Sequence, residues 1–110
     1  MREDTFHIDR DGSLVRAATP RRGKPYRHRC QRETLEAVAH AVDEAGDAGF
    51  VLEEIVAGES LPSSQAATAI AFLKERGCVT TEGRRAYAAS GCVHLDAMTE
   101  YHALRENPEG

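Results

Sequence analysis

The stretch of residues 60–79 restricts the possible folds of this chain more than any other. Small and aliphatic side chains recur in it at Ala66, Ala69, Ile70 and Leu73, three or four residues apart. Side chains with that spacing share one face of an α-helix, whereas alternation in twos is typical of a strand. The spacing predicts a short helix with one buried face, and therefore other elements that cover that face.

The ends of this helix and the segment after it are also marked in the sequence. Ser63 is the expected N-cap, because its hydroxyl can accept a hydrogen bond from an unpaired backbone N–H of the first turn. We expect the helix to run to about Arg76, with Gly77 ending it. Residues 78–89 then predict two strands joined by a turn at Gly83, since β-branched residues come first and a glycine lies at the tip.

Two further helices are predicted before this one. Leu35, Val38 and Val42 recur at helical spacing in an alanine-rich segment that starts at about residue 33 and is stopped by two glycines. Residues 52–57 predict a second, shorter helix, and a very short strand is expected at residues 50–51. The helix with the buried face is therefore the third.

A fourth helix is predicted over residues 94–106. Leu95, Met98, Tyr101 and Leu104 repeat in it every three residues, before an Asn-Pro pair ends it. We expect this stripe to pack on the first helix as part of the core. The alternative is a helix that mediates dimerisation.

Charge is distributed unevenly along the chain. Residues 1–32 carry nine Lys or Arg against four Asp or Glu, whereas residues 33–110 carry five against fourteen. A basic segment attached to an acidic body is typical of a tail that binds a polyanion. We therefore divide the chain into a basic N-terminal arm (1–32), a folded domain (33–106) and a tail (107–110).

The basic arm contains two different segments. Residues 5–16 predict a short hairpin around Asp11-Gly12, because this pair favours the positive φ of a tight turn. Residues 19–25, with two prolines and a glycine, predict an extended linker, since these residues disfavour any regular element.

Composition narrows the class of protein. With 41% hydrophobic and 29% charged residues, the chain has the usage of a globular domain. The charged start and the lack of a long apolar run predict neither a signal peptide nor a membrane helix, so we expect a cytoplasmic protein. Cys30, Cys78 and Cys92 form no Cys-x-x-Cys pair and are expected to be reduced thiols. No catalytic motif is evident, and we expect neither an enzyme nor a cofactor.

The predicted order of helix, short strand, helix, turn, helix and hairpin resembles the winged helix-turn-helix of bacterial transcription regulators, over roughly residues 33–90. The resemblance is carried by the spacing of Ala66, Ala69-Ile70, Leu73 and Gly77. It implies an α+β fold with a three-helix core and a small antiparallel β-wing, to which this chain adds a C-terminal helix.

The resemblance also implies a DNA-binding surface, in which the third helix enters the major groove. Its outward positions would be Ser64, Ala67, Thr68, Ala71 and Glu75. None of these is Arg or Lys, the residues that most often contact guanine or phosphate. Ser64, Thr68 and the flanking Gln65 are the expected contacts to base edges.

Two basic segments are expected to support that contact. Arg84 and Arg85, at the tip of the predicted hairpin, resemble a wing that contacts phosphates or a minor groove; the alternative is a solvated turn. Arg21, Arg22 and Lys24 lie in a segment that resembles an AT-hook, with lysine in place of its second arginine. Such a segment follows the minor groove; the alternative is a plain basic linker.

The expected partner is therefore double-stranded DNA, and the expected role is transcription regulation. The competing hypothesis is a protein-interaction module, in which the face of Ala67 and Ala71 docks a protein partner or a second copy in a homodimer. Folds of this kind host many functions, so the fold alone does not decide between the two.

A zinc site is a further alternative. His28 with Cys30, and Cys92 with His94, are pairs two residues apart whose side chains point to one side of a strand, and together they would supply four ligands for tetrahedral zinc. The competing interpretation is two buried or half-buried thiols and two surface imidazoles.

Overall fold

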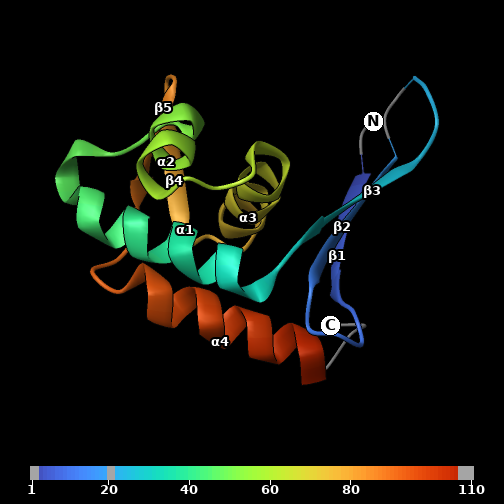
Figure 1. The fold of residues 1–110 in the computed structure, drawn as a ribbon. Helices are drawn as coiled ribbons and strands as arrows, with labels where there is room; N and C mark the ends of the chain where they lie inside the picture. The colour runs from blue at the N-terminus through green and yellow to red at the C-terminus, as the bar shows by residue number, and fades with distance from the viewer. Residues whose placement is uncertain (1–2, 20–21, 107–110) are drawn as a thin grey trace.

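The computed structural model describes residues 3–19 and 22–106, which form two small antiparallel sheets and four α-helices (Figure 1). The elements in chain order are β1 (Glu3–Ile8), β2 (Leu14–Thr19), β3 (Tyr26–Cys30), α1 (Arg32–Ala45), the 3-10 turn η1 (Gly46–Ala48), α2 (Leu52–Glu59), α3 (Ser63–Glu75), β4 (Val79–Glu82), β5 (Arg85–Ala88) and α4 (Val93–Glu106). The predicted α+β class is confirmed. Within the described residues, no helix has the length and apolar character needed to cross a membrane.

Helix α3 forms where the spacing of small and aliphatic residues predicts it. Ala66, Ala69 and Leu73 are completely buried, in the core shared with α1 and α2. The helix begins at Ser63, so the capping position belongs to Pro62, which offers no side-chain hydrogen bond; the expectation that Ser63 caps the helix is wrong by one residue. Gly77 ends the helical region in a left-handed conformation, as predicted.

Helices α1 and α2 pack against α3 from the other side of the core. The predicted buried positions of α1, namely Leu35, Val38 and Val42, are all fully buried. Helix α2 extends two residues beyond the predicted 52–57 and ends at Glu59, followed by Ser60 as its C-cap with a φ of +54°. Instead of a short strand at residues 50–51, a single bridge pairs Phe50 with Ala86 of β5 and anchors the hairpin to the helices.

Helix α4 lies along α1, as the sequence predicts (Figure 1). Its first turn is capped from α1, because the Asp43 carboxylate accepts the backbone N–H groups of Val93 (2.7 Å) and His94 (3.0 Å). The buried side chains are Val93, Ala97, Tyr101 and Leu104, whereas Leu95 is 64% exposed. The predicted stripe is therefore wrong at Leu95: the buried residues start at Val93 and follow at intervals of four, four and three.

The N-terminal segment differs most from expectation. The predicted hairpin is present: β1 pairs with β2, and the Asp11 side chain accepts the backbone N–H of Ser13 at 2.9 Å in the turn. Residues 22–25 form neither helix nor strand, as predicted, but they do not lead directly into the helical domain, because Tyr26–Cys30 form β3 and pair with β2 in antiparallel register. Residues 22–25 therefore lie in a loop that reverses the chain between two strands.

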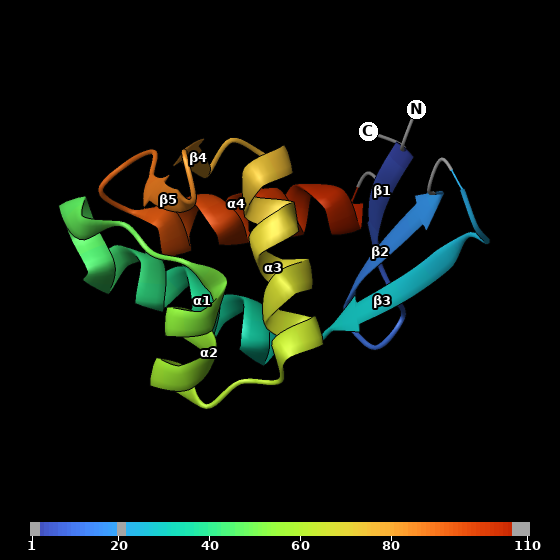
Figure 2. The ribbon, with the colours of Figure 1, turned by 90° about the horizontal axis from the view of Figure 1, so that it is seen from above.

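This three-stranded sheet is part of the same core as the helices, and not a separate arm. The rings of Phe6 and Phe72 meet edge to face with centroids 5.4 Å apart, and Leu14 and Cys30 are fully buried in the same cluster. In the β1–β2 turn, close to Leu14, the Tyr101 hydroxyl of α4 donates a hydrogen bond to the carbonyl of Gly12. Figure 2 shows the sheet on the side of α3 away from the β4–β5 hairpin.

Candidate nucleic-acid interface

Two loops project from one side of the molecule (Figure 1), one on each side of α3 (Figure 2). One is the β2–β3 loop and the other is the turn of the β4–β5 hairpin. Seen from above, α3 lies between the N-terminal sheet and the hairpin (Figure 2). The surface under consideration therefore consists of α3 and these two loops.

The β2–β3 loop carries two of the three basic contacts that are predicted between residues 21 and 24. Arg22 and Lys24 are exposed there, and neither forms a hydrogen bond or ion pair with another described residue. Gly23 between them has a φ of +100°, which only glycine adopts easily, so the chain turns sharply at this point. Arg21 lies outside the described residues.

The turn of the β4–β5 hairpin carries the two basic contacts that are predicted for the wing, Arg84 and Arg85. Their side chains have different surroundings. Arg84 is exposed next to Gly83 at the tip. Arg85 is turned back towards the body: its guanidinium donates to the carbonyls of Ala48 and Gly49, both at 3.2 Å, and pairs with the Glu54 carboxylate at 2.8 Å. The prediction that both arginines extend from the turn was therefore wrong for Arg85, which holds the hairpin against η1 and α2.

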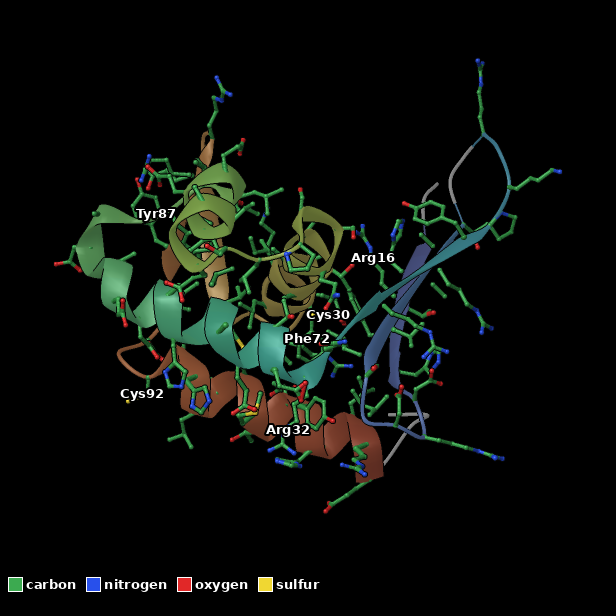
Figure 3. The ribbon with its side chains drawn as sticks, viewed as in Figure 1. Arg16, Cys30, Arg32, Phe72, Tyr87 and Cys92 are labelled. Atoms are coloured by element: carbon green, nitrogen blue, oxygen red, sulfur yellow. The ribbon has the colours of Figure 1, made fainter. Side chains whose placement is uncertain are left out.

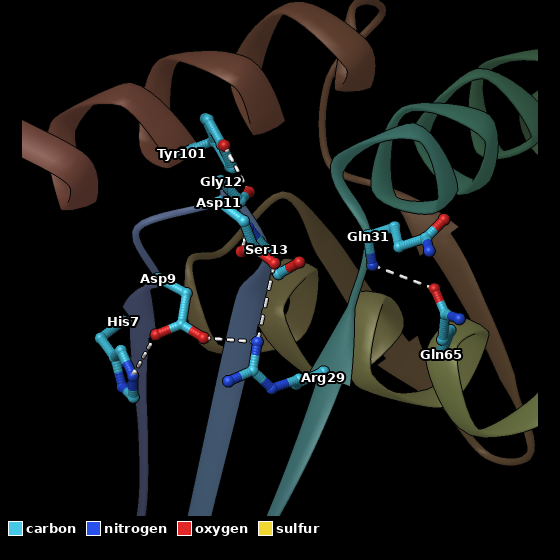
Figure 4. Close-up of polar contacts among 9 residues, drawn as sticks. All are labelled: His7, Asp9, Asp11, Gly12, Ser13, Arg29, Gln31, Gln65 and Tyr101. Carbon is cyan, nitrogen blue, oxygen red and sulfur yellow. Dashed lines mark hydrogen bonds and ion pairs between the residues drawn. The ribbon is translucent and has the colours of Figure 1, made fainter.

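On α3, Ser64 is exposed as predicted, but Gln65 is not directed outwards. Its side-chain carbonyl accepts the backbone N–H of Gln31 (3.0 Å) and the hydroxyl of Thr34 (3.1 Å), as Figure 4 shows for Gln31. The capping residue of α1 offers no side-chain hydrogen bond of its own. Gln65 therefore caps α1 from a neighbouring helix, and its predicted place in the groove is wrong.

Thr68 is also not on the outward surface. It is only 2% exposed, and its hydroxyl donates to the carbonyl of Ser64 one turn earlier, at 3.0 Å. Thr68 and Phe72 are four residues apart and so share a face of α3, and Phe72 contacts the sheet. The prediction assumed that α3 has one buried face, but the N-terminal sheet covers a second one.

The remaining outward surface of α3 is small and mostly uncharged. Ser64 is exposed near its start, Ala67 and Ala71 are half-buried in the middle, and Lys74 and Glu75 are exposed at its end. Lys74 was not among the predicted contacts, although it lies three residues after Ala71 on the same side. With Arg84 it lines an open groove of about 540 Å³ between α2, α3 and the hairpin, together with Val51, Leu52, Glu53 and Arg85.

The four candidate zinc ligands are not brought together. Cys30 is buried beside the start of α1, whereas Cys92 is exposed near the opposite end of that helix (Figure 3). His28 is exposed on β3, and His94 stacks on His40 with ring centroids 3.9 Å apart and has its Nε2 3.2 Å from the Glu36 carboxylate. In residues 3–19 and 22–106, no three His, Cys, Asp or Glu side chains are arranged to hold a metal ion.

Comparison of the chain with protein-family models, with curated proteins and with solved structures gives no match in any of the three.

Proposed function

We propose that the chain binds double-stranded DNA as a winged helix-turn-helix protein and acts as a transcription regulator. In this assignment α1, α2 and α3 are the three-helix core, the β4–β5 hairpin is the wing, and α4 is an additional helix. The observation that carries the proposal is the placement of two basic loops on the same side of the molecule, one on each side of the outward surface of α3.

The dimensions and charges of this surface suit a duplex. A major groove about 12 Å wide accepts an α-helix, and the small side chains of Ala67 and Ala71 allow the backbone of α3 to approach closely. Arg22 and Lys24 on one side, and Arg84 with Lys74 on the other, are exposed cations that can contact phosphates.

Acidic residues nearby limit the strength of this contact. Glu53 and Glu75 are exposed at the same end of the surface as Arg84, and each repels a phosphate backbone. These four cations alone would give a log–log dependence of the binding constant on salt with a slope of about −3.6, at about −0.9 per phosphate.

The competing function is docking of a protein. It is favoured by one observation, namely that the middle of the α3 surface presents alanines and no charge. A second copy of the chain is one such partner, and the exposed Leu95 on α4 offers an apolar contact for it. Neither partner requires the basic loops, which is why DNA is the function we put forward.

Titration of the chain into a fluorescently labelled duplex at several salt concentrations tests the proposal. We expect binding at about 50 mM salt that weakens as salt is raised, and a shallower salt slope for the variant Arg22→Ala/Lys24→Ala. The matched control is Arg10→Ala, which removes an exposed cation from the β1–β2 turn at the opposite end of the sheet and should leave the slope unchanged. Absence of binding to every duplex at low salt would contradict the proposal and leave protein docking as the function.

A further inference from the structure

We infer, on the basis of the proposed function, that the β2–β3 hairpin is a second wing and that the duplex is recognised by the shape of its backbone. In this arrangement the hairpin holds the sugar–phosphate backbone on the side of α3 opposite the β4–β5 wing. Base edges under α3 contribute little to the choice of sequence.

First, the side chains of α3 that could read bases already make hydrogen bonds within the protein. The amide oxygen of Gln65 accepts from Gln31 and Thr34, so a two-point contact with adenine, which needs that oxygen as well as the amide nitrogen, would break both hydrogen bonds. Thr68 is covered by the sheet and bonded to its own helix. Asn and Gln amides and Arg guanidinium groups are the usual two-point readers of base pairs, and the outward surface of α3 has none of them.

The second argument concerns what that surface does offer. Ser64 has one hydroxyl, which discriminates weakly between bases, and the methyl groups of Ala67 and Ala71 have no donor or acceptor. Lys74 lies at the end of the helix, in the groove that it shares with Arg84 of the wing. Its ammonium is therefore placed with the phosphate contacts of the wing, away from the start of α3.

The third argument is that the β2–β3 hairpin is fixed relative to α3. Strands β2 and β3 are paired up to Ala18 and Tyr26, directly below the loop. The sheet is packed on α3 through Phe6 and Phe72, and Gln65 binds the backbone where β3 passes into α1. The strands that carry Arg22 and Lys24 are therefore held in place beside α3, as those of a wing are and a free basic tail is not.

The charges on the sheet also concentrate the contact at the loop. Arg29 of β3 pairs with the Asp9 carboxylate and lies 3.8 Å from that of Asp11, so its charge is offset at the far end of the sheet (Figure 4). Arg22 and Lys24 form no such ion pair among the described residues. Contacts from two cations on a β-ribbon depend on the width of the groove and the position of the phosphates. Both vary with the sequence and deformability of the DNA.

A hydroxyl-radical footprint of the full chain on a long duplex is the first test. The described residues extend 35 Å along their longest axis, about ten base pairs at 3.4 Å each, so one copy should protect backbone on both sides of a central segment within that length. We expect Arg22→Ala/Lys24→Ala to remove protection on one side only and Arg84→Ala to remove it on the other. If both variants lose protection at the same positions, the second wing is overturned. It is also overturned if Arg22→Ala/Lys24→Ala loses no protection at all.

Base substitution in the central segment is the second test. Replacement of A·T by inosine·C pairs keeps the minor-groove pattern and changes the major-groove pattern to that of G·C. We expect the affinity to change by less than about threefold, whereas loss of a two-point base contact lowers it by about 10- to 100-fold. If base substitution lowers the affinity of the unaltered chain by about 10- to 100-fold but does not lower that of Ser64→Ala, then α3 reads bases. That result would overturn the inference and leave DNA binding intact. Absence of binding to any duplex would overturn both.

Discussion

Gln65 shows how one side chain can be committed to structure although its position suggests contact with a ligand. Its carbonyl oxygen serves two donors, a backbone N–H and a threonine hydroxyl, at the junction of β3 and α1. It thereby fixes the direction in which the sheet leaves the helices. Gln65 belongs to α3 in sequence, but its side chain caps α1.

The first prediction concerns this residue. Gln65→Ala should lower the free energy of unfolding by about 1–3 kcal/mol, because two donors lose their acceptor. Gln65→Glu should lower it less, since a carboxylate still accepts both bonds. Urea denaturation measures these changes, and Ser64→Ala, an exposed neighbour, should stay within about 0.5 kcal/mol of the unaltered chain. An effect of Gln65→Ala on DNA affinity without loss of stability would assign Gln65 to base contact after all.

Residue by residue, the sequence was most informative about the side of α3 that faces α1 and α2. Ala66, Ala69 and Leu73 were predicted as buried because helical periodicity reports one packed face directly. Thr68 and Gln65 were mistaken for outward residues because periodicity does not reveal whether another element covers the remaining surface. That element, the N-terminal sheet, is held by contacts between residues distant in sequence.

At the scale of elements, the junction of α1 and α4 depends on one carboxylate. The first N–H groups of a helix have no partner within the helix. Asp43 of α1 accepts two of them in α4, from Val93 and His94, and thereby caps α4. Beside it, His40 and His94 stack across the two helices, a contact that nothing in the spacing of these residues along the sequence indicates.

We expect Asp43→Ala to lower the free energy of unfolding by about 0.5–2 kcal/mol, the usual cost of losing a helix cap. Asp43→Asn should retain part of the stability, because the amide oxygen still accepts one N–H. Asp47→Ala is the matched control, since Asp47 is exposed in η1 and forms no hydrogen bond or ion pair in the described structure. Equal losses for Asp43→Ala and Asp47→Ala in thermal or urea denaturation would argue against the cap.

Elements with strong local patterns were predictable and those without them were not. The four helices were found within a few residues of their ends, and the β4–β5 hairpin was marked by its β-branched residues and Gly83. Strand β3 was missed because Tyr-Arg-His-Arg-Cys contains no β-branched residue and follows two prolines. Its position is set by pairing with β2, a tertiary effect that outweighs local propensity.

For the whole molecule, two buried thiols make the free energy of unfolding depend on pH in the alkaline range. Burial raises the pKa of Cys30 from 9.0 to about 12 and that of Cys78 to about 11. Below pH 9 both thiols are neutral in the folded and the unfolded chain, so they contribute no pH dependence. Above pH 9 they ionise only when the chain unfolds, which favours the unfolded state until the pH passes the folded-state pKa.

The free energy of unfolding should therefore fall between about pH 9 and pH 11, by at most about 1.4 kcal/mol per pH unit for each thiol. Comparison of the slope for the unaltered chain with that for Cys30→Ala isolates the contribution of one thiol, whatever the cavity in the variant does to stability at neutral pH. Cys92→Ala is the control, because that thiol is exposed. Identical slopes for the unaltered chain and Cys30→Ala would show that Cys30 is accessible to water.

The hydrogen bond between Tyr101 and Gly12 joins residues 89 positions apart. During translation the β1–β2 turn is made long before α4, which supplies its anchor. Contacts of such long sequence separation slow folding, since a large loop has to close before they form. We therefore expect the β1–β2 turn to reach its final position only after α4 has been synthesised, and the apolar face of its sheet to be exposed to chaperones until then.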